Sequence, residues 1–172
     1  MDKTGVIQEH GKKKLEIYKQ YLKNYLSVLI QSRYYSQIYV YDVCAGSAKD
    51  IRGTHGSALI AAQIISNYLL NKTNNHTWLK LFVNELDKER FKTLNKELKQ
   101  FGFIESSNKE ADDFLKSQLE IKTNPKRQNL FFIDPFGYTQ YSFSSLFQIA
   151  SNIKNSEFLI FIPISSIVRF AN

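Results

Sequence analysis

Short runs of β-branched and aromatic residues recur along this chain, and each of the first four leads to an acidic residue. The runs cover residues 38–41, 79–83, 103–104, 130–133 and 158–162. The acids that follow the first four runs are Asp42, Glu85, Glu110 and Asp134. Runs that are apolar on both faces are typical of buried parallel strands covered by helices on each side.

The segments between these runs have the spacing of helices. Apolar residues recur every three or four positions within 15–29, 58–70, 88–100 and 143–153, and a shorter helix is expected after Asp113. We expect Ser57 to cap the second helix and Gly102 to end the third. The sequence therefore predicts an α/β fold of three layers around a mostly parallel sheet. A chain of 172 residues fits one such domain, with the basic amphipathic helix of residues 1–34 packed on it.

The acids at the strand ends point to a ligand site. In an open parallel sheet, ligands bind in the crevice beyond the carboxyl ends of the strands. The small-residue turn after Asp42, with Gly46, would let the backbone approach a nucleotide closely. Glu85 could accept hydrogen bonds from ribose hydroxyls, and Glu110 could meet an adenine edge. The loop after Asp134 would then lie at the reactive end of the ligand.

Ordinary structural roles explain some of the same residues. Asp42 could be a simple exit from a strand, and Glu85 could favour a helix dipole together with Asp87. The acids around Glu110 could be solvated surface, and so could the lysines of residues 12–14. The sequence leaves both interpretations open for each position.

Several classes of protein are disfavoured by what the sequence lacks. The longest apolar run, residues 158–164, is far shorter than the roughly 20 residues that span a bilayer. Cys44 is the only cysteine, and no N-terminal stretch resembles a secretion signal, so we expect a cytoplasmic protein. The three histidines are scattered, so no metal site is predicted. The glycine-rich loops of nicotinamide-dependent oxidoreductases and of phosphate-binding NTPases are missing.

The net charge of +7 and the pI near 9.4 suit a polyanionic partner such as nucleic acid. A lysine-rich surface without such a partner explains the charge equally well.

Five motifs together resemble one known family. They are Asp42-Val43-Cys44-Ala45-Gly46-Ser47-Ala48, Gly56-Ser57-Ala58, Glu85-Leu86-Asp87, Glu110-Ala111 and Asp134-Pro135-Phe136-Gly137, preceded by a helix that contains Lys14. In this order they resemble the three-Cys-motif partner family, a bacterial group with a fold like that of S-adenosylmethionine (SAM) methyltransferases. The resemblance extends over nearly the whole chain. It implies a Rossmann-like fold of the class I SAM-methyltransferase type.

The resemblance also implies a cofactor and its ligands. SAM would be held by Lys14, Asp42, Ala45, Gly46, Glu85, Glu110 and Ala111. The Asp-Pro-Phe-Gly motif is similar to the Asp-Pro-Pro-aromatic motif of methyltransferases that act on the amines of adenine or cytosine. It would make Asp134, Pro135 and Phe136 the catalytic residues. Three positions depart from the family pattern, because Val43 and Ala48 replace glycines and Ser47 replaces a proline.

Two hypotheses of function follow from these patterns. In the first, the chain is a SAM-dependent methyltransferase acting on a nucleic-acid amine. In the second, it is a catalytically inactive module of the same fold that binds nucleic acid or a protein in a bacterial mobile-element or defence system. Methyltransferases of this type usually have seven strands, and the five counted here predict a sheet truncated after the fifth. The exposed fifth strand would then invite a protein partner.

Overall fold

The computed structural model describes residues 5–71, 76–122, 124–135 and 142–162. Five strands lie within these ranges: β1 (Gln37–Asp42), β2 (Trp78–Asn84), β3 (Ile104–Ser107), β4 (Arg127–Ile133) and β5 (Ser156–Ile160). The helices are α1 (Glu9–Ser32), α2 (Ser57–Leu70), α3 (Lys88–Leu98), α4 (Ala111–Gln118) and α5 (Phe143–Asn152). Helix and strand therefore alternate from α1 to β5, as the spacing of apolar residues predicts.

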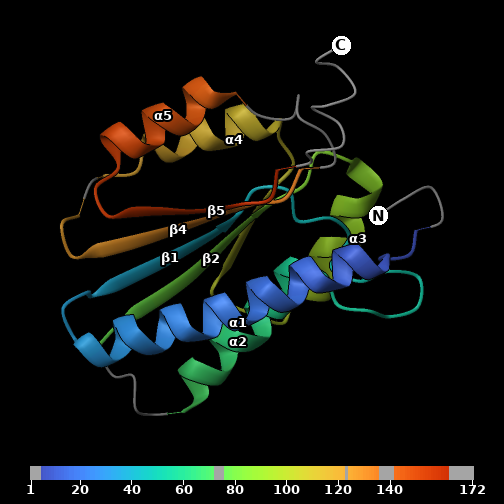
Figure 1. Ribbon diagram of the computed structural model, residues 1–172, viewed down its shortest axis with the longest axis horizontal. Coiled ribbons are helices and arrows are strands. Elements are labelled where there is room, and N and C mark those ends of the chain that lie inside the picture. Colours follow the sequence, from blue (N-terminus) through green and yellow to red (C-terminus); the bar gives the residue numbers. More distant parts are fainter. Residues whose placement is uncertain (1–4, 72–75, 123, 136–141, 163–172) are drawn as a thin grey trace.

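The five strands form one parallel sheet in the order β3-β2-β1-β4-β5 (Figure 1). From β1 the chain moves outward to β2 and β3, and it then returns to place β4 on the other side of β1. This reversal creates a topological switch point between β1 and β4, where ligands bind in folds of this kind. The predicted fold is confirmed: the described residues have a Rossmann-like α/β arrangement around one parallel sheet.

Helices cover both faces of the sheet (Figure 1). One apolar cluster joins the sheet to α1, α2 and α3, and a second joins it to α4 and α5. The alternation along β4 shows why its run is apolar throughout. Leu130 and Phe132 belong to the first cluster, whereas Phe131 and Ile133 belong to the second.

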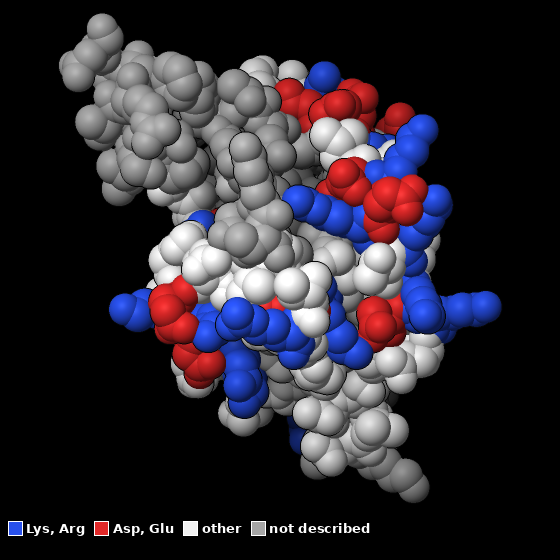
Figure 2. All heavy atoms as spheres, turned by 90° about the vertical axis from the view of Figure 1, so that its right-hand side faces the viewer, with Lys and Arg blue, Asp and Glu red and all other residues white. Residues whose placement is uncertain are grey.

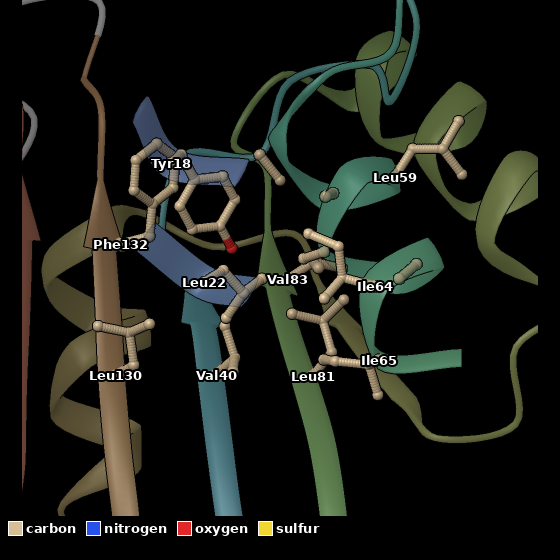
Figure 3. Packing of buried hydrophobic residues seen from close by; sticks show 14 of the residues in the cluster. Tyr18, Leu22, Val40, Leu59, Ile64, Ile65, Leu81, Val83, Leu130 and Phe132 are labelled. Atoms are coloured by element: carbon tan, nitrogen blue, oxygen red, sulfur yellow. The ribbon is translucent and has the colours of Figure 1, made fainter. Parts of the chain in front are cut away.

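One aromatic contact fixes the position of α1 on the sheet. The ring of Tyr18 stacks on that of Phe132 in β4, with 4.0 Å between the ring centroids (Figure 3). Both side chains are almost fully buried, with Leu22 and Leu26 packing further along the same side of α1. The N-terminal helix is thus part of the core.

Three local expectations are wrong in detail. The N-cap of α2 is Gly56, and Ser57 is the first residue of the helix. Helix α3 ends at Leu98, ahead of Gly102, which lies outside the left-handed region. β4 begins at Arg127 instead of residue 130, because three polar residues of its first half are buried. Residues 165–172, whose sequence resembles the first turns of a helix, lie outside the described residues.

Strand β5 forms one edge of the described sheet, and its five residues are partly exposed. Within the described ranges, no helix is both long enough and apolar enough to cross a membrane.

Candidate functional site

A cavity of about 330 Å³ opens at the carboxyl edge of the sheet, beside the switch point. Its walls come from the segment before α1, the start of α1, the loop after β1, the start of α2 and the loop after β4. The predicted site residues in this wall are Lys14, Ala45, Gly46, Asp134 and Pro135. Segments that are far apart in the sequence therefore meet at one edge of the sheet.

A second, narrower hollow of about 30 Å³ adjoins the cavity. Its walls contain Glu85, Glu110 and Ala111, three further predicted site residues. Cys44 lines both spaces, so the two lie on either side of the loop that follows β1. The narrow hollow has room for one or two water molecules as it stands.

The loop between the two spaces contains two left-handed residues. Gly46 and Ala48 both have φ +67°. Ala48 thus takes a conformation that favours glycine. The amide of Gly56 donates a 2.6 Å hydrogen bond to the Ala48 carbonyl, and a Cβ on Gly56 would lie only 3.2 Å from that oxygen. A side chain at position 56 would press on this carbonyl, so glycine favours the close approach of the two backbones that places the start of α2 at the cavity wall.

Helix α2 begins at this wall, and Ser57 lines the cavity. The first N–H groups of a helix have no partner within the helix, and they carry a partial positive charge. The N-terminus of α2 can therefore stabilise an anionic group bound in the cavity.

Asp42 ends β1 and is completely buried at the base of this loop. Neither carboxylate oxygen makes a hydrogen bond of normal geometry, although the Ser57 hydroxyl and the Cys44 amide are close enough to favour the charged form. Burial, together with the negative charges of Asp134 and Glu85, raises the pKa of Asp42 from 3.8 to about 7. Asp42 is a buried acid beneath the cavity wall and does not itself line the cavity.

Glu85 is buried and organises the loop from the other side. Its carboxylate accepts hydrogen bonds from the amides of Gly46, at 2.8 Å, and Asp87, at 2.9 Å. Asp87 in turn caps α3 by accepting from the amides of Glu89 and Arg90. Glu85, the acid predicted to bind ribose, therefore holds the left-handed residue Gly46 in place through a hydrogen bond.

Asn84 is a structural residue of the site that the sequence reasoning missed. Its amide group donates to the carbonyls of Val43 and Lys109, and its oxygen accepts from the Ser107 hydroxyl and the Lys109 amide. It thereby ties the exits of β1, β2 and β3 together. The only signal in the sequence was the position of Asn84, directly before the acid Glu85 at the end of the second apolar run.

Lys14 and Asp134 form an ion pair across the mouth of the cavity. Lys14 Nζ lies 2.6 Å from Asp134 Oδ1, and the side chains are 32% and 25% exposed. The ammonium group also lies 5.4 Å from the ring centroid of Phe161, just beyond β5. Of the predicted catalytic motif, Asp134 and Pro135 line the cavity, and Phe136 lies outside the described residues.

The segment before α1 was also missed as part of the site. Ile7 of this segment lines the cavity, as does His10 in the first turn of α1, and the carboxylate of buried Asp50 accepts a 3.1 Å hydrogen bond from the Ile7 amide. Burial alone would raise the pKa of Asp50, but hydrogen bonds from the amides of Ile7, Thr54 and Arg52 bring it below its ordinary value. Only the polar turn between β1 and α2 hinted at this anchor.

The described residues contain no cluster of three or more histidine, cysteine or acidic side chains arranged to hold a metal ion.

Comparisons with known proteins find similarity only among solved structures. No model of a known protein family matches the sequence, and no curated protein does. The Escherichia coli protein yhhF, provisionally described as a methyltransferase, superimposes with a TM-score of 0.43 and 19% identity over 79% of this chain. A Klebsiella pneumoniae protein, provisionally described as an O-methyltransferase, gives 0.36 and 14% over 72%. Thermoplasma acidophilum 1320 gives 0.36 and 15%, covering 92% of this chain and 74% of its own. The match spans 60% of the first protein and 52% of the second.

Proposed function

We propose that this chain is a SAM-dependent methyltransferase that acts on an amine of a nucleic-acid base. The observation that carries the proposal is the position of two spaces on either side of the loop after β1, at the switch point. The narrow hollow at Glu85 and the larger cavity at Lys14 and Asp134 share the wall formed by Cys44. A nucleoside and its reactive end need two such adjoining spaces.

The residues that line the two spaces have the chemical groups that an S-adenosyl ligand needs. Gly46 and Ala48 bring backbone to the wall of the cavity, and the start of α2 supplies N–H groups for a carboxylate. Glu85 offers a carboxylate for ribose hydroxyls, and Glu110 lies beside it. The hollow must widen for an adenine, and two of its wall residues, Leu86 and Glu110, are exposed.

The departures from the family pattern leave the cavity open. Val43 belongs to the buried cluster on the α4 and α5 side and also lines the narrow hollow, but it is not part of the wall of the larger cavity. Ala48 adopts the left-handed conformation that glycine would take. Both residues therefore preserve the shape of the loop. This supports the proposal that the chain has retained its ligand site.

The bound cofactor would supply an electrophilic methyl group, and the residues of the chain would position the acceptor. Asp134 can accept hydrogen bonds from an exocyclic amine, which aligns the nitrogen lone pair and is chiefly a matter of orientation. The amine must release a proton when it gains a methyl group, and the Asp134 carboxylate is a base within the cavity. Lys14 balances the charge of this carboxylate until the amine enters.

A second candidate function rests on Glu85. Its carboxylate already accepts two backbone amides, and the hollow beside it is narrow. These features suit an inactive module that keeps the fold and binds nucleic acid without a cofactor.

Transfer of tritiated methyl groups from SAM to mixed cellular RNA and DNA separates the two candidates. We expect incorporation by the wild-type chain, and a loss on the order of 10²-fold in Asp134→Asn, where the acceptor is misplaced. Glu105→Gln is the control, because Glu105 pairs with Lys80 at the β3 edge of the sheet, away from the site. Binding of nucleic acid without any incorporation would favour the inactive module and contradict the enzyme.

A further inference from the structure

A groove of about 520 Å³ runs between α1 and α2, outside the cavity described above. The two helices lie side by side along the face of the molecule (Figure 1). The loop of residues 53–55 closes one end of the groove, and Ile60 and Ile64 contribute its apolar surface. The proposed cofactor and amine sites use none of these residues.

Three lysines of α1 line this groove. Lys12, Lys19 and Lys23 are spaced seven and four residues apart, which places them on one side of the helix. Lys12 pairs with Glu9 at 2.6 Å and Lys19 with Glu16 at 3.9 Å, and both acids are largely exposed. Glu16 is the one acid that itself lines the groove, against three lysines. Exposed pairs of this kind contribute little, so a phosphate can replace the acid. Among the described acids, none lies within ion-pair distance of Lys23.

The opposite wall, from α2 and the loop of residues 53–55, contains no Lys, Arg, Asp or Glu. Gln63 and Asn67 present exposed amides from α2, and Thr54 and His55 add a hydroxyl and an imidazole. None of the residues that line the groove is a Phe, Tyr or Trp. The groove therefore offers cations and hydrogen-bonding groups without a platform for stacked bases, which suits a sugar-phosphate backbone.

The groove leads to the cavity. Leu15 lines both spaces, and the groove's loop of residues 53–55 runs directly into Gly56 and Ser57 at the cavity wall. Figure 2 faces the edge of the molecule where the strands end, and blue basic side chains form a band across its middle and a group at the upper right, with red acids between them. A backbone in the groove would thus bring one base to Asp134. A cavity of about 330 Å³ admits a base only when it is unpaired and unstacked.

From these observations we infer that the groove between α1 and α2 binds the backbone of single-stranded RNA and delivers an unpaired base to the Asp134 cavity, an inference that rests on the proposed function. The amides of Gln63 and Asn67 and the Thr54 hydroxyl favour RNA over DNA, because they can donate to or accept from a ribose 2′-hydroxyl.

Fluorescence anisotropy with labelled oligo(U) and oligo(dT) of about 12 nucleotides tests the inference. The groove variant is Lys19→Ala with Lys23→Ala, and the control is Lys122→Ala with Lys154→Ala. The control removes the same charge from exposed positions next to α4 and α5, on the opposite layer. We expect the groove variant to bind oligo(U) about tenfold more weakly at low salt. Its plot of log affinity against log salt should be less steep by about 1.4, since each lost phosphate contact contributes about 0.7. The control should stay within about twofold of wild type.

Three results would overturn the inference. Equal losses in the two double variants would mean that net charge alone binds the oligonucleotide. Equal affinity for oligo(dT) would reject the assignment to RNA. Displacement of oligo(U) by polyglutamate at matched charge would point to an acidic protein as the partner.

A titration of the same variants with S-adenosylhomocysteine keeps this test separate from the proposed function. The groove variant should bind that ligand like wild type, because neither lysine lines the cavity. Oligo(U) binding that depends on the groove in a chain that ignores S-adenosylhomocysteine would remove the methyltransferase proposal, and with it the delivery of a base for methylation. If the wild-type chain binds S-adenosylhomocysteine and the groove variant binds oligo(U) like wild type, only the proposal for the groove is rejected.

Discussion

Lys14 Nζ lies 2.6 Å from Asp134 Oδ1, although 120 residues separate the two in the sequence. Helix and strand periods explain the meeting. Lys14 precedes Tyr18 by one helical turn, and Asp134 follows Phe132 by two residues, so each lies on the same side of its element as the aromatic partner. The Tyr18 and Phe132 rings stack (Figure 3). This contact holds α1 against β4 so that Lys14 and Asp134 meet at the cavity.

The Lys14–Asp134 pair should contribute little to stability. Both side chains are partly exposed, so a double-mutant cycle of Lys14→Ala and Asp134→Asn should give a coupling of about 1 kcal/mol or less. Urea unfolding of the four proteins measures it. The Lys80–Glu105 pair, at 2.7 Å, serves as a reference with a similarly exposed lysine. A coupling above about 3 kcal/mol would show a desolvated pair and contradict this account.

Glu85 should matter for both stability and ligand binding. Glu85→Gln replaces a carboxylate that accepts two amides with a group that can accept fewer, at a cost of about 1–3 kcal/mol in the free energy of unfolding. The affinity for S-adenosylhomocysteine should fall at least about tenfold with loss of the ribose acceptor.

Asp87→Ala is the matched control for Glu85. It removes the cap of α3 and should cost about 1 kcal/mol while leaving ligand affinity unchanged. Equal losses of affinity in the two variants would mean that Glu85 acts only through the stability of the fold.

The strands could be predicted where apolar residues run without interruption, and β4 shows where this fails. Arg127 is buried with its guanidinium over the Tyr39 ring, and Asn129 accepts from the Tyr41 hydroxyl, so polar residues occupy core positions through specific partners. No pattern of hydrophobicity reveals such partners. The gathering of acids at one sheet edge was predictable because parallel strands share a direction. The Lys14–Asp134 pair and the anchoring of Ile7 by Asp50 depend on how distant segments pack, and so lay beyond the sequence.

Substitution of Gly46 or Gly53 by alanine tests the role of the loop, because both changes should cause the same backbone strain. Both have positive φ, and a Cβ on either would meet nothing within 4 Å. Each change to alanine should therefore destabilise the fold by about 1–2 kcal/mol through strain alone. Gly46 lines the cavity and Gly53 does not, so only Gly46→Ala should weaken binding of S-adenosylhomocysteine. Unfolding curves and ligand titrations of both variants check this, and a similar affinity loss in Gly53→Ala would refute it.

Asp42 should make the protein less stable as the pH rises. The pKa of Asp42 is 3.8 in the unfolded chain and about 7 in the folded chain. Between pH 3.8 and about 7, the folded chain therefore holds a proton that the unfolded chain has released. The stabilising contribution is complete below about pH 4, falls by at most about 1.4 kcal/mol per pH unit up to about pH 7, and is then lost. Asp42→Asn should remove this fall and be the more stable form at pH 8. Parallel pH profiles of unfolding for the two proteins would contradict the burial of a titrating carboxyl.

The ligand site itself is tested most directly by calorimetric titration of the wild-type chain with S-adenosylhomocysteine. We predict saturable heat with one ligand per chain, because the Glu85 hollow and the Asp134 cavity lie on either side of one loop and can hold a single extended nucleoside. Absence of heat at millimolar ligand, with the chain folded, would contradict the assignment of these two spaces to an S-adenosyl cofactor.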